Sequence, residues 1–381
     1  MLLSISILLI LAILFAELAG RIGIPPLVGM IAAGVVAAPY LSEELMALSG
    51  DLRTFALVVI LMRAGLSLDL DLLRRSGRVT ALLSFLPALF EIAGIVALAP
   101  MILGISYIDA AVMGCVVAAV SPAIIVPRMI DLKERREGRK VAQVIMAASS
   151  IDDLFVILLF SIFLKMGISG EFTPSLLLDL PLSIISGVVV GIVVGLILSK
   201  LFKIYSLRDT IKVALILAIS LSLMALEKSL DVPFSPLLSV ICIGAVLGRR
   251  NVTQGSRVAV KFGKVWAVAQ LLLFSLVGAS VDIGYAWQSG AAVVVVVLGA
   301  LVWRVVGVWL STAGGGFTRG ERLFSMIAYT PKATVQAAIG AIPLSLGLPS
   351  GEIILSIAVV SILITAPFGA AGIDWGAKKL L

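Results

Sequence analysis

The stretch ASSIDDLF, at residues 148–155, places two adjacent aspartates in an apolar run that extends from Val141 to Met166. Carboxylates without partners are costly in hydrocarbon, so acids at membrane depth indicate a functional site. Two carboxylates this close, away from water, favour the binding of a proton at one of them. When ionised, the same oxygens suit a hard cation such as Na+ or Li+. We therefore expect Asp152 and Asp153 to bind a cation and a proton in competition, with different roles because helix neighbours point about 100° apart.

The composition is that of an integral membrane protein. Hydrophobic residues make up 61% of the 381 residues and charged residues 13%, about half the ~25% that is typical of soluble domains. Apolar runs of the ~20 residues that span a bilayer fill nearly the whole chain, and all should be helices because an open sheet cannot satisfy its backbone in lipid. We predict thirteen spans, at roughly 1–19, 25–40, 51–68, 78–103, 108–130, 140–166, 174–201, 208–228, 234–250, 260–282, 288–312, 321–346 and 351–375.

The residue types present limit the chemistry. Histidine is absent, which excludes a histidine-based pH switch. The two cysteines, Cys115 and Cys242, lie in apolar runs and show neither metal-ligand spacing nor a disulfide framework. We therefore predict no cofactor.

Basic residues are concentrated in alternate connections between the predicted spans, for example in residues 128–140 and 249–264. By the positive-inside rule these connections are cytoplasmic. The amino terminus should then lie outside and the carboxyl terminus in the cytoplasm. The net charge of +7 is thus explained by topology and by contacts with membrane lipids, and it does not indicate a nucleic-acid partner.

Three short motifs recur in the same order about 210 residues later. The paired segments are Pro26–Val36 with Pro236–Val246, Gly65–Asp69 with Gly278–Asp282, and Ser121–Val126 with Thr330–Val335. The offset spans seven predicted helices, an odd number, so the two copies should cross the bilayer in opposite directions. We therefore predict two inverted six-helix repeats, spans 1–6 and 8–13, an arrangement typical of secondary transporters.

The third repeated motif predicts two discontinuous helices. Ser121-Pro122 and Thr330-Pro331 each fall near the middle of a span, where proline removes a hydrogen bond and clashes with the preceding turn. Breaks at matching positions of two repeats indicate a transport site near the midplane of the bilayer.

Other charged residues also lie inside the predicted spans. Glu91 and Arg304 occupy repeat-related positions and should form a buried salt bridge, separate from the aspartates, that ties the two halves together. Lys332, in the second predicted break, should neutralise an aspartate or the carbonyl end of a half-helix. Arg63 lies nearer the end of its span and is expected to snorkel.

Together these residues resemble the monovalent cation/proton antiporter superfamily, most closely the branch of Na+/H+ exchanger domain-containing proteins and their bacterial relatives. The matching segments are SIDD at 150–153, SPA at 121–123, WR at 303–304, RAGL at 63–66 and TPKATVQAA at 330–338. The chain departs from the family pattern in three places. Asp152 stands where electroneutral relatives often have asparagine, Val120-Ser121-Pro122 replaces a common Thr-Asp-Pro, and Arg304 stands where some members have lysine.

The resemblance implies an all-α fold with a core domain at 78–166 and 288–375, a dimerisation domain at 1–77 and 167–287, and crossed discontinuous helices in the fifth and twelfth spans. It also implies a homodimer whose core moves like an elevator. Asp153 resembles the ion-binding aspartate, with Asp152 and Ser121 beside it. Supporting charges are expected at Lys332, Arg304 and Glu91, and secondary candidates are Ser150, Thr330, Thr334, Gln336 and Arg63.

These observations favour a Na+(Li+)/H+ antiporter, not an enzyme, in a prokaryotic cytoplasmic (inner) membrane. A K+/H+ antiporter of the same fold and an organic-anion/Na+ symporter are alternatives. An intramembrane aspartyl protease is disfavoured, because its two aspartates share a proton from separate helices. A non-transporting scaffold gives no reason for matched charges at the midplane.

Overall fold

The computed structural model describes residues 1–68, 77–134, 138–169, 174–227, 234–281 and 283–381, and it contains only helices and turns within them. The described residues do not include Asp69 and Asp282, which end the two copies of one repeated motif. The side chain of Ser150 is also not described. Nine helices in the described ranges are long and apolar enough to cross a membrane, and Pro26–Tyr40 and Thr334–Ser345 are shorter apolar helical segments. The all-helical membrane class is confirmed, whereas the number of thirteen spans stays a prediction.

The chain forms two compact units. The first comprises Met1–Gly50, Leu70–Ile168 and Phe274–Leu381, and the second comprises Asp51–Asp69 and Ser169–Leu273. Helices of the first unit are α1 (Leu2–Arg21), α2 (Pro26–Ala37), η1 (Ala38–Tyr40), α5 (Gly77–Leu83), α6 (Leu86–Leu103), α7 (Tyr107–Ala118), α8 (Pro122–Glu134), α9 (Arg139–Ser169), α14 (Ile283–Thr312), α15 (Arg319–Ala328), α16 (Thr334–Ile339), α17 (Ile342–Ser345) and α18 (Gly351–Lys379). The second unit contains α10 (Pro174–Ile204), α11 (Asp209–Glu227) and α12 (Pro236–Arg250), while α3 (Glu43–Leu66) and α13 (Val252–Ala279) contribute residues to both.

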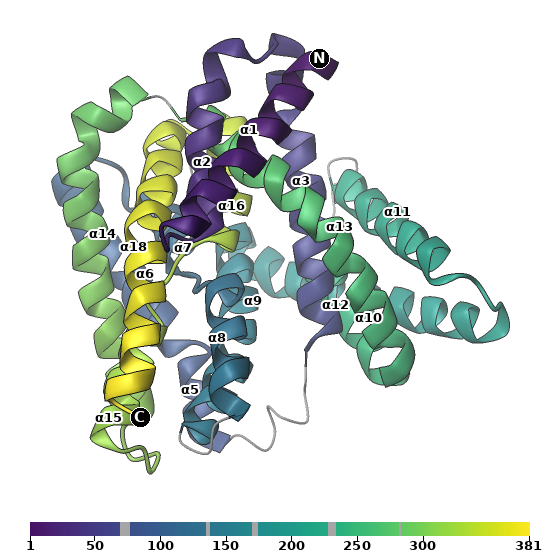
Figure 1. Cartoon of the computed structure of the whole chain (residues 1–381). Coiled ribbons are helices and arrows are strands. Elements are labelled where there is room, and N and C mark those ends of the chain that lie inside the picture. The colour runs from purple at the N-terminus through teal and green to yellow at the C-terminus, as the bar shows by residue number, and fades with distance from the viewer. Residues whose placement is uncertain (69–76, 135–137, 170–173, 228–233, 282) are drawn as a thin grey trace. The chain divides into compact units, whose positions relative to one another are not determined.

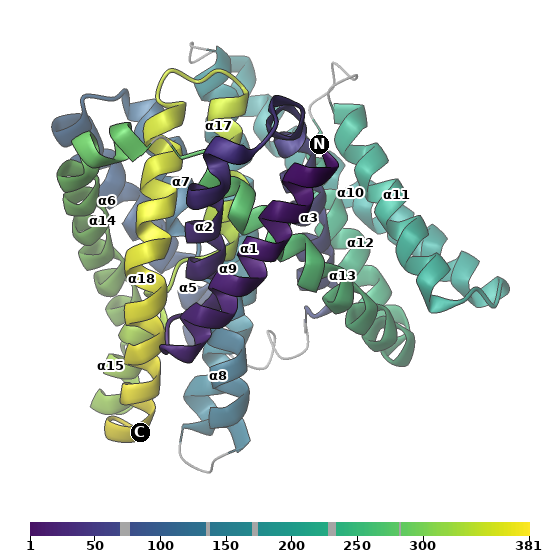
Figure 2. The same cartoon turned by 45° about the horizontal axis from the view of Figure 1, so that its top comes forward.

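Within the first unit, α6 packs along α14, and α14 also contacts α18 (Figure 1). Within the second unit, α12 packs against both α10 and α11 (Figure 2). The short half-helices α7 and α15 begin with side-chain caps that satisfy their first backbone N–H groups. Ser106 Oγ accepts from the Asp109 N–H at 3.0 Å, and Thr318 forms a capping box with Glu321. Local sequence therefore determines where both half-helices start.

The glycines of the repeated motifs lie at close helix crossings. In the first unit a Cβ added to Gly34 of α2 would collide with the backbone carbonyl of Ser275 in α13. A Cβ on Gly278 of α13 would collide in the same way with the carbonyl of Ile31 in α2. Only glycine lets the two backbones approach so closely, which is the usual role of small residues between membrane helices.

The second unit contains the corresponding crossing, between α3 and α12. A Cβ on Gly65 would collide with the carbonyl of Ile241, and one on Gly244 would lie 2.8 Å from the carbonyl of Met62. Each of these residues matches, at the repeat offset, a residue of the crossing in the first unit. The recurring motifs therefore encode the same kind of contact twice.

Replacing Gly278 with valine is expected to lower the thermal unfolding temperature, because neither backbone can move without loss of packing. Overpacking of this kind costs about 1–3 kcal/mol or more. Gly263 is the matched control on the same helix, since a Cβ there meets nothing within 4 Å. Thermal unfolding of the detergent-solubilised protein tests the difference, and equal stability of Gly278→Val and Gly263→Val would contradict it.

Candidate ion-binding site

The helix breaks predicted at the two Ser/Thr-Pro motifs are present. Helix α7 ends at Ala118 and α8 begins at Pro122, while α15 ends at Ala328 and α16 begins at Thr334. The residue before a proline avoids the helical region, and both such residues, Ser121 and Thr330, lie in the non-helical segments. The Ser121 N–H donates to the Pro331 carbonyl at 2.9 Å, so the two breaks are bonded directly to each other.

Cationic side chains cap the carbonyl ends of both half-helices. Arg304 of α14 donates from Nη1 to the Ala118 carbonyl and from Nε to the Tyr329 carbonyl at 2.5 Å. Lys332 Nζ also donates to the Ala118 carbonyl, at 3.3 Å. The last carbonyls of a helix lack intrahelical partners and carry partial negative charge. Positive charge therefore compensates the ends that face the breaks, as expected for Lys332.

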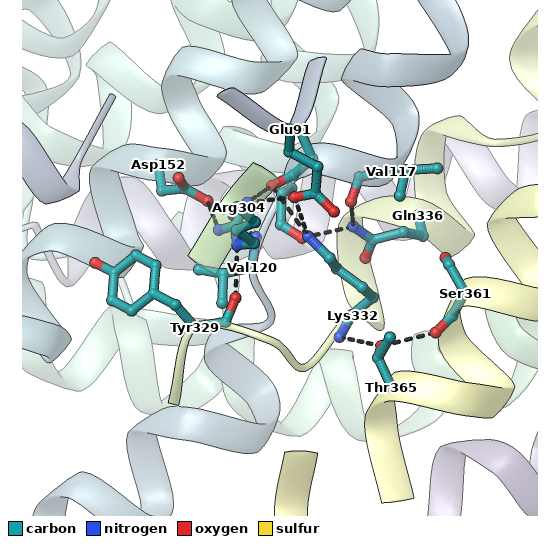
Figure 3. A network of polar contacts seen from close by, with 12 residues as sticks. Glu91, Val117, Val120, Asp152, Arg304, Tyr329, Lys332, Gln336, Ser361 and Thr365 are labelled. Atoms are coloured by element: carbon teal, nitrogen blue, oxygen red, sulfur yellow. Dashed lines mark hydrogen bonds and ion pairs between the residues drawn. The ribbon is translucent and has the colours of Figure 1, made fainter. Parts of the chain in front are cut away.

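Gln336 of α16 completes the capping of α7. Its Nε2 donates to the carbonyls of Val117 and Ala119, at 3.0 and 2.6 Å, and its Oε1 accepts from the Ala333 N–H at 2.8 Å. One buried amide thus links the end of α7 to the start of α16 (Figure 3). Gln336 was expected only as a secondary ion contact, and its contacts instead position the two helix ends.

A single carboxylate oxygen joins the two buried cations. Glu91 Oε2 of α6 lies 2.6 Å from Arg304 Nη1 and 2.6 Å from Lys332 Nζ, and all three side chains are fully buried. The predicted Glu91–Arg304 salt bridge is therefore confirmed. Of the two partners expected for Lys332, the carbonyl end of a half-helix is present and an aspartate is not, because its carboxylate partner is Glu91 (Figure 3).

Asp152 is held by two donors. Its Oδ2 accepts from the Val120 N–H at 2.9 Å and from Arg304 Nη2 at 3.2 Å. The Val120 N–H belongs to the break just before α8, where free backbone donors and the helix dipole attract negative charge. Arg304 forms ion pairs with both Glu91 and Asp152. The expectation that the Glu91–Arg304 pair is separate from the aspartates is therefore also wrong.

Asp153 has a different environment. It is 7% exposed, and its Oδ1 is buried with no hydrogen-bond partner in the described part of the chain. The Ser121 hydroxyl is fully buried and also has no partner there. Buried polar atoms are almost always paired, so each of these two atoms can accept a further partner.

Buried apolar side chains surround residues of both helix breaks. Val120 and Tyr329 belong to a buried apolar cluster that also contains Ile145, Ala148 and Phe324. Electrostatic interactions are stronger in such surroundings than in water. The charged groups at the breaks therefore act on one another with little screening.

The remaining candidates contribute less. The Thr330 hydroxyl donates to the Ile327 carbonyl at 2.8 Å, and Thr334 is buried at the start of α16. Arg63 is exposed, in agreement with snorkelling. The side chain of Ser150 is outside the described residues.

Sequence reasoning missed two residues near the breaks. The Tyr329 ring lies 5.6 Å from the Arg304 guanidinium carbon, and its buried hydroxyl has no partner among the described residues. Thr365 of α18 accepts from the Lys332 N–H at 2.8 Å and donates to the Ser361 carbonyl at 2.7 Å. Tyr329 could have been noticed because it directly precedes Thr330-Pro331, whereas Thr365 carries no local signal.

Known proteins are similar to this chain in sequence and in fold. Residues 5–376 match the model of the transmembrane sodium/hydrogen exchanger family. The human protein named sodium/hydrogen exchanger 9B2 is 31% identical over 379 residues, covering 94% of this chain and 70% of the relative. The protein of the same name from Bison bison bison is 34% identical over 376 residues, with the same coverage. The sodium proton antiporter MjNhaP1 from Methanocaldococcus jannaschii, at pH 8, has the same fold, with a TM-score of 0.85, 21% identity and coverage of 100% of this chain and 99% of that chain.

Proposed function

Because this chain belongs to the transmembrane sodium/hydrogen exchanger family, we propose that it exchanges Na+ or Li+ for H+ across the membrane at a site formed by Asp153. Membership also confirms the resemblance to monovalent cation/proton antiporters, a family of transporters rather than enzymes. The protease and the organic-anion symporter receive no support from it. The observation that carries the proposal is the buried Asp153 oxygen that has no partner in the described residues.

The balance of the buried charges supports Asp153 as the exchanging group. Two cations, Arg304 and Lys332, contact two carboxylates, Glu91 and Asp152, so that these four charges sum to zero. A fifth charge on Asp153 is left uncompensated. An isolated buried carboxylate is strongly unfavourable, and either a bound Na+ or a bound proton removes that cost. One carboxylate that accepts either ion, but not both, is sufficient for exchange.

The neighbouring groups have supporting roles in this proposal. Asp152 is held by Val120 and Arg304, and its Oδ1, which has no partner among the described residues, would serve as a second cation ligand. The unpartnered hydroxyl of Ser121 is a further oxygen ligand of the kind that Na+ accepts. Arginine keeps its proton at any physiological pH, so Arg304 serves as a fixed charge and not as a carrier.

Proteoliposomes that contain the purified chain and an internal pH dye provide the test. Adding Na+ or Li+ outside is expected to release protons from acidified vesicles, whereas choline should not. Comparable or faster release with K+ alone would assign the protein to the K+/H+ alternative. No release with any of the three alkali cations would overturn the proposal.

We further propose inverted repeats and an elevator motion of the core domain at 78–166 and 288–375 against the segments 1–77 and 167–287. The matched glycine contacts of α2 with α13 and of α3 with α12 support the inverted repeat. We retain the homodimer, the outside amino terminus and the cytoplasmic carboxyl terminus as parts of the proposal. The asymmetric distribution of basic residues supports the orientation.

A further inference from the structure

A pocket of about 660 Å³ lies within the second unit, whereas the residues of the helix breaks belong to the first. It is formed by the turn between α10 and α11, the turn between α12 and α13, and the adjoining helix ends. Its charged lining consists of five cations and one carboxylate, namely Lys203, Arg208, Lys212, Arg257, Lys261 and Asp209. We call these six residues and the space they line the basic pocket.

The single carboxylate of the basic pocket is already engaged. Asp209 Oδ1 lies 3.3 Å from Lys212 Nζ, and Asp209 Oδ2 lies 3.5 Å from Arg257 Nε. The structure gives Lys203, Arg208 and Lys261 no ion pair with any described residue. Four positive charges therefore remain uncompensated around one cavity, and like charges held together raise the free energy of the empty pocket.

One of the cations is fixed in the pocket wall. The side chain of Lys212 is only 6% exposed, and its Nζ lies 5.7 Å from the centre of the Phe202 ring. A cluster that served only as a topology signal would need neither a concave shape nor a buried ammonium group. The basic pocket therefore has the features of a binding site for an anion.

Two helix starts border the same cavity. Asp209 and Thr210 begin α11, and Asn251 caps α13 by accepting from the Gln254 N–H at 3.1 Å. The first N–H groups of a helix lack intrahelical partners, and the dipole favours negative charge there. Hydroxyl groups of Ser206 and Thr210 also line the pocket. Several donors around a positive cavity suit the three or four oxygens of a phosphate group.

We propose that the basic pocket binds a phosphate-bearing anion, either the headgroup of an anionic phospholipid or a soluble phosphate. The site is independent of Asp153 and of ion exchange. Its failure in a binding experiment leaves the proposed function untouched, and the reverse also holds.

The test measures binding to the purified full chain in a zwitterionic detergent. The probes are dihexanoyl phosphatidic acid, dihexanoyl phosphatidylcholine and inorganic pyrophosphate, and the readout is the unfolding temperature against probe concentration. Phosphatidic acid is expected to stabilise the protein, with an effect that weakens as salt is added. Phosphatidylcholine, which has no net charge, is expected to have no effect.

A matched pair of double variants locates the effect. Lys203→Gln with Lys261→Gln removes two cations from the basic pocket, and Lys378→Gln with Lys379→Gln removes two exposed cations at the end of α18. We expect the first variant to weaken phosphatidic acid binding roughly tenfold or more, and the second to leave it unchanged. The single variant Arg208→Gln, at an exposed position, repeats the test should the first double variant fold poorly.

The outcomes separate the two sources of phosphate. Stabilisation by phosphatidic acid but not by pyrophosphate assigns the site to a lipid headgroup, and stabilisation by both, with mutual competition, assigns it to a phosphate group from either source. Both outcomes support the proposal. Absence of binding by both probes would overturn it, as would an equal loss of binding in the two double variants.

Discussion

Replacing Asp153 with asparagine is expected to abolish Na+-dependent proton exchange and leave the protein folded. Asparagine has nearly the same shape but carries no charge and does not take up a proton in the physiological range. The four charges around the breaks remain balanced without Asp153, so the substitution removes the exchanging group and no structural partner. Dye-loaded proteoliposomes measure the rate, which should fall to that of vesicles without protein.

Asp109 provides the matched control. It is also a buried aspartate in the first unit, but its Oδ2 accepts from the Ser350 hydroxyl at 2.7 Å, away from the helix breaks. The amide oxygen of Asp109→Asn can still accept that hydrogen bond, so exchange should remain close to the unmodified rate. Undiminished exchange by Asp153→Asn, with Na+ or Li+, would show that the ion binds elsewhere.

The features that sequence reasoning predicted well are those with a local physical cause. Proline removes a helix hydrogen bond and clashes with the preceding turn, and its presence at matching positions of the repeat predicted the breaks beside Pro122 and Pro331. Proline alone is not sufficient, because Pro100, Pro127 and Pro367 lie inside helices. Glu91 and Arg304 were paired because a charge in hydrocarbon requires an opposite one, and because they occupy matching positions of the repeat. Neither inference needed knowledge of how the helices cross.

The features that sequence reasoning predicted wrongly depend on that crossing. An aspartate was one of the two partners expected for Lys332, but the direct bond between Ser121 and Pro331 accompanies a geometry in which its ammonium group reaches Glu91. Gln336 contacts α7 for a similar reason, because its partners are backbone carbonyls more than 200 residues away in sequence. Backbone acceptors have no side-chain signature, so no pattern in the sequence could identify them.

Replacing Glu91 with glutamine should strongly destabilise the protein, because Glu91 is the shared partner of two buried cations. The substitution leaves Asp152 as the only anionic partner within the described network, and of the two cations Asp152 pairs with Arg304 and not with Lys332. Breaking a buried ion pair by removing one partner costs about 3–5 kcal/mol. The exposed pair of Glu17 and Arg21 is the control, and Glu17→Gln should change stability by less than about 1 kcal/mol.

Charge balance also predicts which second substitution restores part of the stability that Glu91→Gln loses. Adding Lys332→Met to Glu91→Gln removes the surplus cation, and the remaining pair of Arg304 and Asp152 is neutral. Methionine is apolar and similar in length to lysine, so it can fill the buried space that the ammonium group vacates. The double variant is therefore expected to unfold at a higher temperature than Glu91→Gln alone. Additive destabilisation would instead mean that Glu91 acts through its shape and hydrogen bonds, because compensation of charge makes the double variant more stable than the sum of the two single effects predicts.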